Sequence, residues 1–123
     1  MKMENVRYSV VKDRGIIRAS IIGCKYDALR EFNKRFVAHS TSAMWTWVDK
    51  DDSRFVMPHK FSVTIKLHPD DVWDENKGKN IALRRLAEKY NRSLDKHLLN
   101  IYKALTKSMG KMETYLSDHH LIE

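Results

Sequence analysis

The sequence predicts an α+β fold in which helices pack on an antiparallel sheet of about five strands. Short alternating apolar segments fill most of residues 6–67, and from residue 74 onward apolar residues recur at helical steps of three and four. One helix is predicted between two hairpins, and two C-terminal helices are expected to cover the sheet. Residues 1–123 are predicted to form a single domain, because no repeat, low-complexity tract or linker divides them.

Two β-hairpins are predicted in the first half of the chain. Residues 6–12 alternate, Asp13-Arg14-Gly15 has the composition of a turn, and the β-branched segment 16–22 follows. The segment 43–49 is rich in strand-forming residues, and 54–57 is expected to pair with it after a polar turn.

A helix is predicted at residues 25–37, where Tyr26, Leu29, Phe32 and Phe36 recur at helical spacing. The clearest strand is residues 60–67, whose side chains alternate strictly between apolar and polar. Pro69 is expected to end that strand, because proline has no N–H to donate to a ladder.

Two helices are predicted after this strand. Asp74 is expected to cap the first, with Glu75 in the positive first turn. The polar triplet Asn91-Arg92-Ser93 is expected to interrupt the helical pattern, so that a last helix of about 25 residues follows.

The last predicted helix has two opposite faces. Its apolar residues advance by steps of 4, 3, 4, 4, 3 and 4 and form what we call the apolar seam: Leu94, Leu98, Ile101, Leu105, Met109, Met112 and Leu116. Four lysines on the opposite side form what we call the basic ridge: Lys96, Lys103, Lys107 and Lys111. A seam of this length predicts a homo-oligomer that pairs through the C-terminal helix, or a helix that only covers its own sheet.

Composition limits the classes of function. The chain has a net charge of +7, and between residues 76 and 111 ten Lys or Arg oppose two acids, which predicts an anionic partner. No apolar run is long enough to span a bilayer, so no membrane partner is expected. Cys24 is the only cysteine, and with no signal-peptide pattern the predicted location is the cytoplasm.

The junction between the last strand and the following helix is the first candidate site. Trp73 lies in a polar stretch and could stack on a base, while a glycine between two lysines near a helix start favours a phosphate. The predicted anion-binding residues are Trp73, Lys77, Gly78, Lys79, Arg84, Arg85 and Arg92. A plain solvated helix start remains the alternative.

No catalytic, metal or cofactor site is predicted. The acids of the junction match no familiar metal spacing, and neither Cys24 nor the histidines belong to a recognisable nucleophile motif. Trp45 and Trp47 share one face of a predicted strand, where they could stack on nucleobases or fill the core.

The stretch Lys66-Leu67-His68-Pro69-Asp70-Asp71, followed by Gly78, Ala82, Arg85 and Leu86, resembles a pattern in small phage-encoded proteins. Together with the predicted plan of sheet and C-terminal helices, it resembles the Thoeris anti-defence sponges. This resemblance implies a phage protein, acting in the bacterial host cell, that sequesters a cyclic ADP-ribose-type signal without cleaving it.

Three functions are therefore expected, and none is enzymatic. The first is binding of a phosphate-bearing nucleotide at the junction residues. The second is binding of a DNA or RNA backbone along the basic ridge, with a strong dependence on salt. The third is docking on an acidic host protein as an inhibitor, in the manner of anti-CRISPR or other anti-defence proteins.

Overall fold

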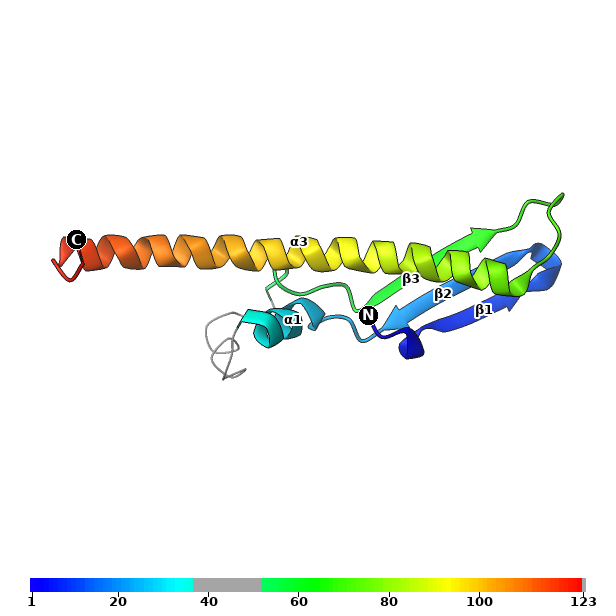
Figure 1. The fold of residues 1–123 in the computed structure, drawn as a ribbon, viewed down its shortest axis with the longest axis horizontal. Helices are drawn as coiled ribbons and strands as arrows, with labels where there is room; N and C mark the ends of the chain where they lie inside the picture. The colour runs from blue at the N-terminus through cyan, green and yellow to red at the C-terminus, as the bar shows by residue number, and fades with distance from the viewer. Residues whose placement is uncertain (37–51, 123) are drawn as a thin grey trace.

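The computed structural model describes residues 1–36 and 52–122, which form a three-stranded sheet and two α-helices (Figure 1). The elements in chain order are two 3-10 turns, η1 (Met3–Asn5) and η2 (Lys12–Arg14), the strands β1 (Arg7–Val11), β2 (Ile16–Ile22) and β3 (Lys60–Lys66), and the helices α1 (Asp27–Phe36) and α3 (Glu75–Asp118). The α+β class is confirmed, but the predicted number of strands and helices is wrong.

The sheet has the order β1-β2-β3, with antiparallel neighbours. The first predicted hairpin is confirmed: Val11 pairs with Ile16 around a turn in which Gly15 has a φ of 63°, a left-handed conformation that favours glycine. The predicted strand at 60–67 is confirmed as β3, which pairs with β2 from Lys66 opposite Ile16 to Lys60 opposite Ile22.

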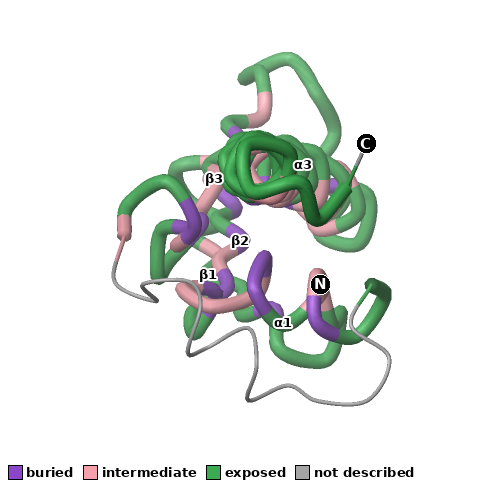
Figure 2. The backbone as a smooth tube through the Cα atoms, turned by 90° about the vertical axis from the view of Figure 1, so that its left-hand side faces the viewer, coloured by how far each residue is buried: buried purple, intermediate pink, exposed green. Residues whose placement is uncertain are grey.

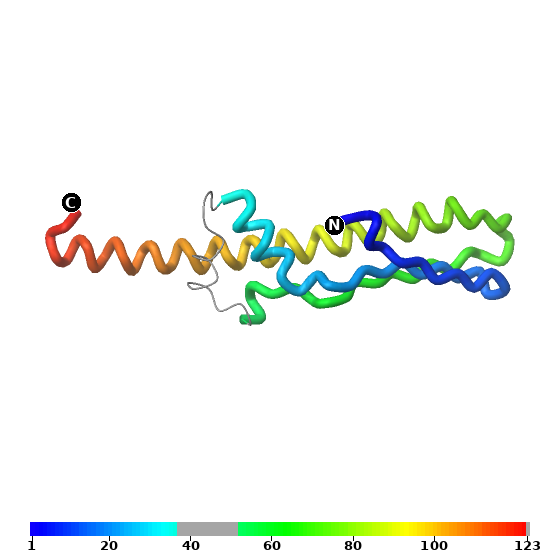
Figure 3. The backbone as a smooth tube through the Cα atoms, turned by 90° about the horizontal axis from the view of Figure 1, so that it is seen from below, coloured from blue at the N-terminus to red at the C-terminus, as the bar shows by residue number. Residues whose placement is uncertain are grey.

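Helix α3 covers one face of the sheet, and the core lies between them (Figures 1 and 2). Alternate residues of β2 and β3 point to α3, including Ile17, which is fully buried, and Phe61. From α3, Ala82 and Leu86 close this layer with no exposed surface. Beyond the sheet, α3 contacts α1 and then continues past both (Figure 3).

The predicted strand at 54–57 is wrong. Phe55 and Met57 are buried, but the backbone is a turn organised by Asp52. The Asp52 carbonyl accepts the N–H groups of Phe55 and Val56, and its carboxylate accepts the Arg54 N–H at 2.9 Å and the Arg54 guanidinium at 2.7 Å. These local bonds replace a strand ladder. The other predicted strand of this hairpin, 43–49, lies outside the described residues, as do Trp45 and Trp47.

The two predicted C-terminal helices are one helix of 44 residues. Asn91 and Ser93 cost only a few tenths of a kcal/mol each in a helix interior. Tyr90, His97 and Ile101 on either side of them are buried, and packing of these residues outweighs that cost. The predicted cap is confirmed, since the Asp74 carboxylate accepts the Lys77 N–H at 3.0 Å.

A buried polar contact joins α1 to α3. The Tyr90 hydroxyl donates to the Asp27 carboxylate at 2.7 Å, and Cys24 is buried beside this pair. Burial, then the hydrogen bond to Asp27, raises the pKa of Tyr90. Burial and the nearby Asp27 charge raise the pKa of Cys24 to about 11. Both groups therefore hold their protons more tightly in the folded chain than in the unfolded chain.

Stability is consequently expected to fall in alkali. Below the ordinary pKa of cysteine the Cys24 contribution is fully present; as the pH rises from about 9 to 11, the unfolded chain ionises first and unfolding is favoured. The slope from one such group is at most about 1.4 kcal/mol per pH unit. Urea unfolding at pH 8 to 11 should show this decline, and it should be shallower in Cys24→Ala. An equal decline in both proteins would contradict the assignment.

Candidate functional site

The predicted junction is organised by the cap of α3. Asp74 accepts the Lys77 N–H with its side chain and the Gly78 N–H with its carbonyl at 3.0 Å. Gly78 is buried and faces the sheet, where a Cβ atom would lie 2.3 Å from Cδ1 of Ile17. The glycine therefore allows close packing of helix on strand, and its N–H group already has a protein acceptor.

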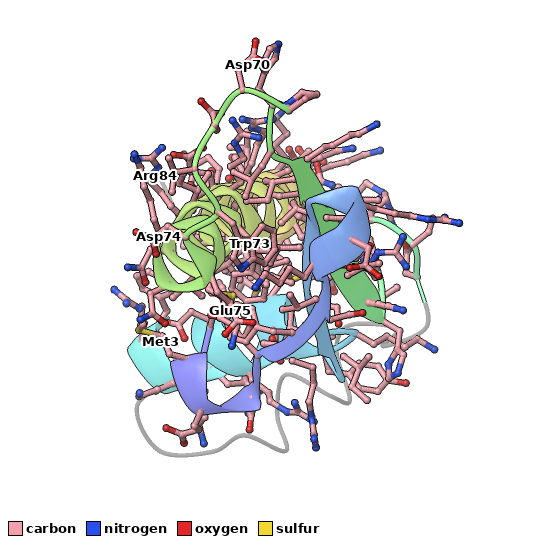
Figure 4. The ribbon with its side chains drawn as sticks, turned by 90° about the vertical axis from the view of Figure 1, so that its right-hand side faces the viewer. Met3, Asp70, Trp73, Asp74, Glu75 and Arg84 are labelled. Atoms are coloured by element: carbon pink, nitrogen blue, oxygen red, sulfur yellow. The ribbon has the colours of Figure 1, made fainter. Side chains whose placement is uncertain are left out.

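Two of the predicted residues share a groove on the outer side of α3. Lys77 and Arg84 line it together with Asp74, Asn76 and Asn80, and its volume is about 610 Å³. Figure 4 shows Arg84 on the side of the helix that faces away from the sheet. Lys77 and Arg84 are exposed, so the groove offers an anion two cations and two amides, beside the carboxylate of Asp74.

Trp73 and Lys79 point elsewhere. Trp73 is half-buried and packs against the core, and Figure 4 places it between the first turn of α3 and the sheet. The Lys79 ammonium lies 3.5 Å from the Glu75 carboxylate and 5.5 Å from the ring centroid of Tyr8. The seven predicted anion-binding residues therefore do not converge on one site.

The structure instead combines the other two predicted arginines with the basic ridge. Successive residues of a helix turn by about 100°, and because α3 is continuous the angular positions of all its side chains can be compared. Most of its cations gather in one sector about 100° wide. This sector holds seven exposed cations, which we call the basic face: Arg85, Lys89, Arg92, Lys96, Lys103, Lys107 and Lys111. Between residues 85 and 111 no acid lies in it, because Glu88 and Asp95 fall outside the sector.

Two hydrogen bonds fix the basic face beside the rest of the domain. The Lys89 ammonium donates to the Ser62 carbonyl of β3 at 3.1 Å, and the Asn100 amide donates to the Arg54 carbonyl at 3.0 Å. Between these bonds, Arg92 and Lys96 line a groove of about 510 Å³ whose other wall includes Pro58. The basic face therefore borders a shallow groove at the edge of the sheet.

Sequence reasoning missed a second basic surface, on the outer face of the sheet. β1, β2 and β3 contain no acid, and the residues that face away from α3 include Arg7, Arg18, Lys60 and Lys66, all exposed. The Arg18 guanidinium donates to the Thr64 hydroxyl at 3.1 Å. The alternation within each strand was a sufficient signal for this surface, had the polar faces of all three strands been compared.

Neither a metal site nor a membrane-spanning helix is found in residues 1–36 and 52–122. No three His, Cys, Asp or Glu side chains there come together to hold a metal ion. No helix in that part of the chain is long and apolar enough to cross a bilayer. Comparison of the chain with known protein families, curated proteins and solved structures found no match.

Proposed function

We propose that the protein binds the backbone of nucleic acid through the basic face, without catalysis. The observation that carries this proposal is the arrangement of seven exposed cations in one acid-free sector of a single helix. At about 1.5 Å per residue, residues 85–111 span roughly 40 Å. One turn of B-DNA is roughly 34–36 Å long. The basic face is therefore about as long as one turn of duplex.

The chemistry of the basic face favours phosphates over bases. Five of its seven cations are lysines, which act as flexible point charges toward phosphate. Among residues 85–111 no aromatic side chain lies in the sector, so it offers no platform for stacking on bases. Binding is therefore expected to depend little on nucleotide sequence.

Self-association would strengthen such binding without being required for it. The C-terminal end of α3 exposes apolar residues, and we assign this surface to a second copy of the chain. A dimer carries two basic faces, so binding of one to a long polymer raises the effective concentration of the other.

The test is fluorescence anisotropy with labelled 20-nucleotide duplex DNA, duplex RNA and single strands. If four to six phosphates are contacted, affinity for duplex should fall roughly 150-fold to 2,000-fold between 50 and 200 mM salt. Scrambling the duplex sequence should change affinity little. Salt-independent binding, or no binding at 50 mM salt, would contradict the proposal.

A second candidate function is binding of a phosphate-bearing nucleotide. The groove lined by Lys77 and Arg84 favours this function. A phage-type protein that sequesters a nucleotide immune signal would use such a groove. Unlabelled ADP-ribose and cyclic dinucleotides in the same assay distinguish the two. Displacement of the duplex by one nucleotide at micromolar concentration would support this candidate, whereas displacement only in proportion to ionic strength supports the backbone proposal.

A further inference from the structure

The last part of α3 exposes apolar side chains that no described element covers. Leu105 is the last residue of α3 to pack against the core, and the helix continues to Asp118 beyond the sheet and α1 (Figures 1 and 3). Tyr102, Met109, Met112 and Tyr115 are 64%, 60%, 62% and 58% exposed. A cluster of exposed apolar side chains on one helix is typical of an interaction surface.

We infer that two copies of the chain pair through the part of the apolar seam that their own cores leave uncovered, together with Tyr102, with their α3 helices antiparallel. The pairing is independent of whether the basic face binds nucleic acid. The seam steps of 4, 3, 4, 4, 3 and 4 repeat every eleven residues, so that Leu94, Leu105 and Leu116 occupy equivalent positions. Such a repeat keeps its apolar residues facing a partner helix with only a slight right-handed supercoil.

The distribution of charge explains why the occupant is a second copy. Each chain has a net charge of +7, yet the basic ridge lies on the side of α3 opposite the seam. Two copies can therefore pack seam to seam with their lysines pointing outward. A membrane surface would instead favour cations around the exposed apolar end of the helix, whereas residues 112–122 contain Glu113 and Asp118 and no Lys or Arg.

The area is also of the right order for a stable dimer. A fully covered aromatic side chain buries 150–250 Å², so Tyr102 and Tyr115, each about three-fifths exposed, offer roughly 100–150 Å² apiece. Met109 and Met112 are also exposed on the seam side, so each copy offers several hundred Å², the same order as the roughly 800 Å² per partner of a standard interface.

The antiparallel orientation follows from the charge along the helix. Residues 84–96 contain five cations and two acids, whereas residues 112–122 contain Glu113, Asp118 and no Lys or Arg. A parallel pair would place the two basic stretches side by side. An antiparallel pair separates the two basic stretches along the helix axis, and it also opposes the two helix dipoles.

One register places every exposed seam residue opposite an apolar residue. When Leu98 lies level with Leu116 of the partner copy, Leu105 lies level with the partner's Met109, and Tyr102 with the partner's Met112. In this register Leu98 of one copy and Leu98 of the other are separated by 18 residues along the helix axis, or roughly 27 Å.

Sedimentation velocity tests the pairing at tens of micromolar protein. The wild type should sediment as a dimer of twice 14.5 kDa. Met112→Glu should weaken dimerisation at least tenfold, whereas Thr114→Glu, an equal change on the opposite side of the helix, should leave it unchanged. Monomeric wild type, or equal effects of the two substitutions, would overturn the inference.

Disulfide trapping tests the orientation. Leu98→Cys and Leu116→Cys chains, mixed and oxidised, should form the mixed disulfide, because only that pair comes within the 4.4–6.8 Å between Cα atoms that a disulfide needs. Cys24 is 1% exposed and stays in place as the background. Disulfides between identical variants, with none between the two, would indicate a parallel pair and overturn the antiparallel assignment.

Discussion

Reversing three charges on the basic face, in the variant Arg92→Glu, Lys96→Glu, Lys103→Glu, is expected to weaken binding to duplex DNA by about a hundredfold or more at 100 mM salt. Each lost cation removes a phosphate contact with its released counterion, and each new carboxylate repels the backbone. The slope of log affinity against log salt should also fall by about one for each lost contact. Anisotropy titrations at several salt concentrations measure both quantities.

The matched control carries the same change of charge on other surfaces: Lys34→Glu, Lys77→Glu and Arg84→Glu. All six substituted residues are exposed, so neither variant should lose core packing. The control should weaken binding only severalfold, through net charge, and should keep the salt slope. If the control loses as much affinity as the test variant, the loss does not depend on the basic face and the backbone proposal fails.

The sequence predicted the elements whose local signals agree with their packing. The hairpin at 6–22, the helix at α1, the strand at β3 and the Asp74 cap were all found, because each has an alternating or helical pattern with a turn or cap residue at its end. Where local and tertiary signals disagreed, prediction failed. Residues 91–93 read as a break, yet packing of Tyr90 and His97 carries the helix through them.

The error at 91–93 also explains why the candidate site was divided in the prediction. With two helices, Arg85 and Arg92 belonged to the junction, and the basic ridge belonged to a separate element. In the one continuous helix that the structure shows, Arg85, Arg92 and Lys103 lie on the same side. The angular position of one residue relative to another can be calculated only within a single helix, so the predicted break at 91–93 prevented this grouping.

Gly78 shows a second limit of sequence reasoning. A glycine between two lysines predicted a phosphate loop, but the same residue is needed for contact between α3 and β2. Sequence alone does not distinguish these two uses of a glycine, since both require the absence of a Cβ atom. The distinction depends on which side of the helix faces the sheet.

Gly78→Val is expected to destabilise the fold by about 1–3 kcal/mol. A Cβ at this position would lie 2.3 Å from Cδ1 of Ile17 and 3.7 Å from Cδ1 of Ile65. Ile17 is fully buried and Ile65 nearly so, and neither has space to move without displacing other core residues. The added side chain therefore separates α3 from the sheet at the first turns of the helix.

The same substitution at Gly110 provides the control. No atom lies within 4 Å of a Cβ built at Gly110, and the residue is exposed within α3. Because valine has a better helix propensity than glycine by a few tenths of a kcal/mol, Gly110→Val should be neutral or slightly stabilising. Urea unfolding of both variants, followed by circular dichroism, measures the difference. If Gly78→Val is as stable as Gly110→Val, close packing at Ile17 is not what requires the glycine, and a ligand role for Gly78 regains support.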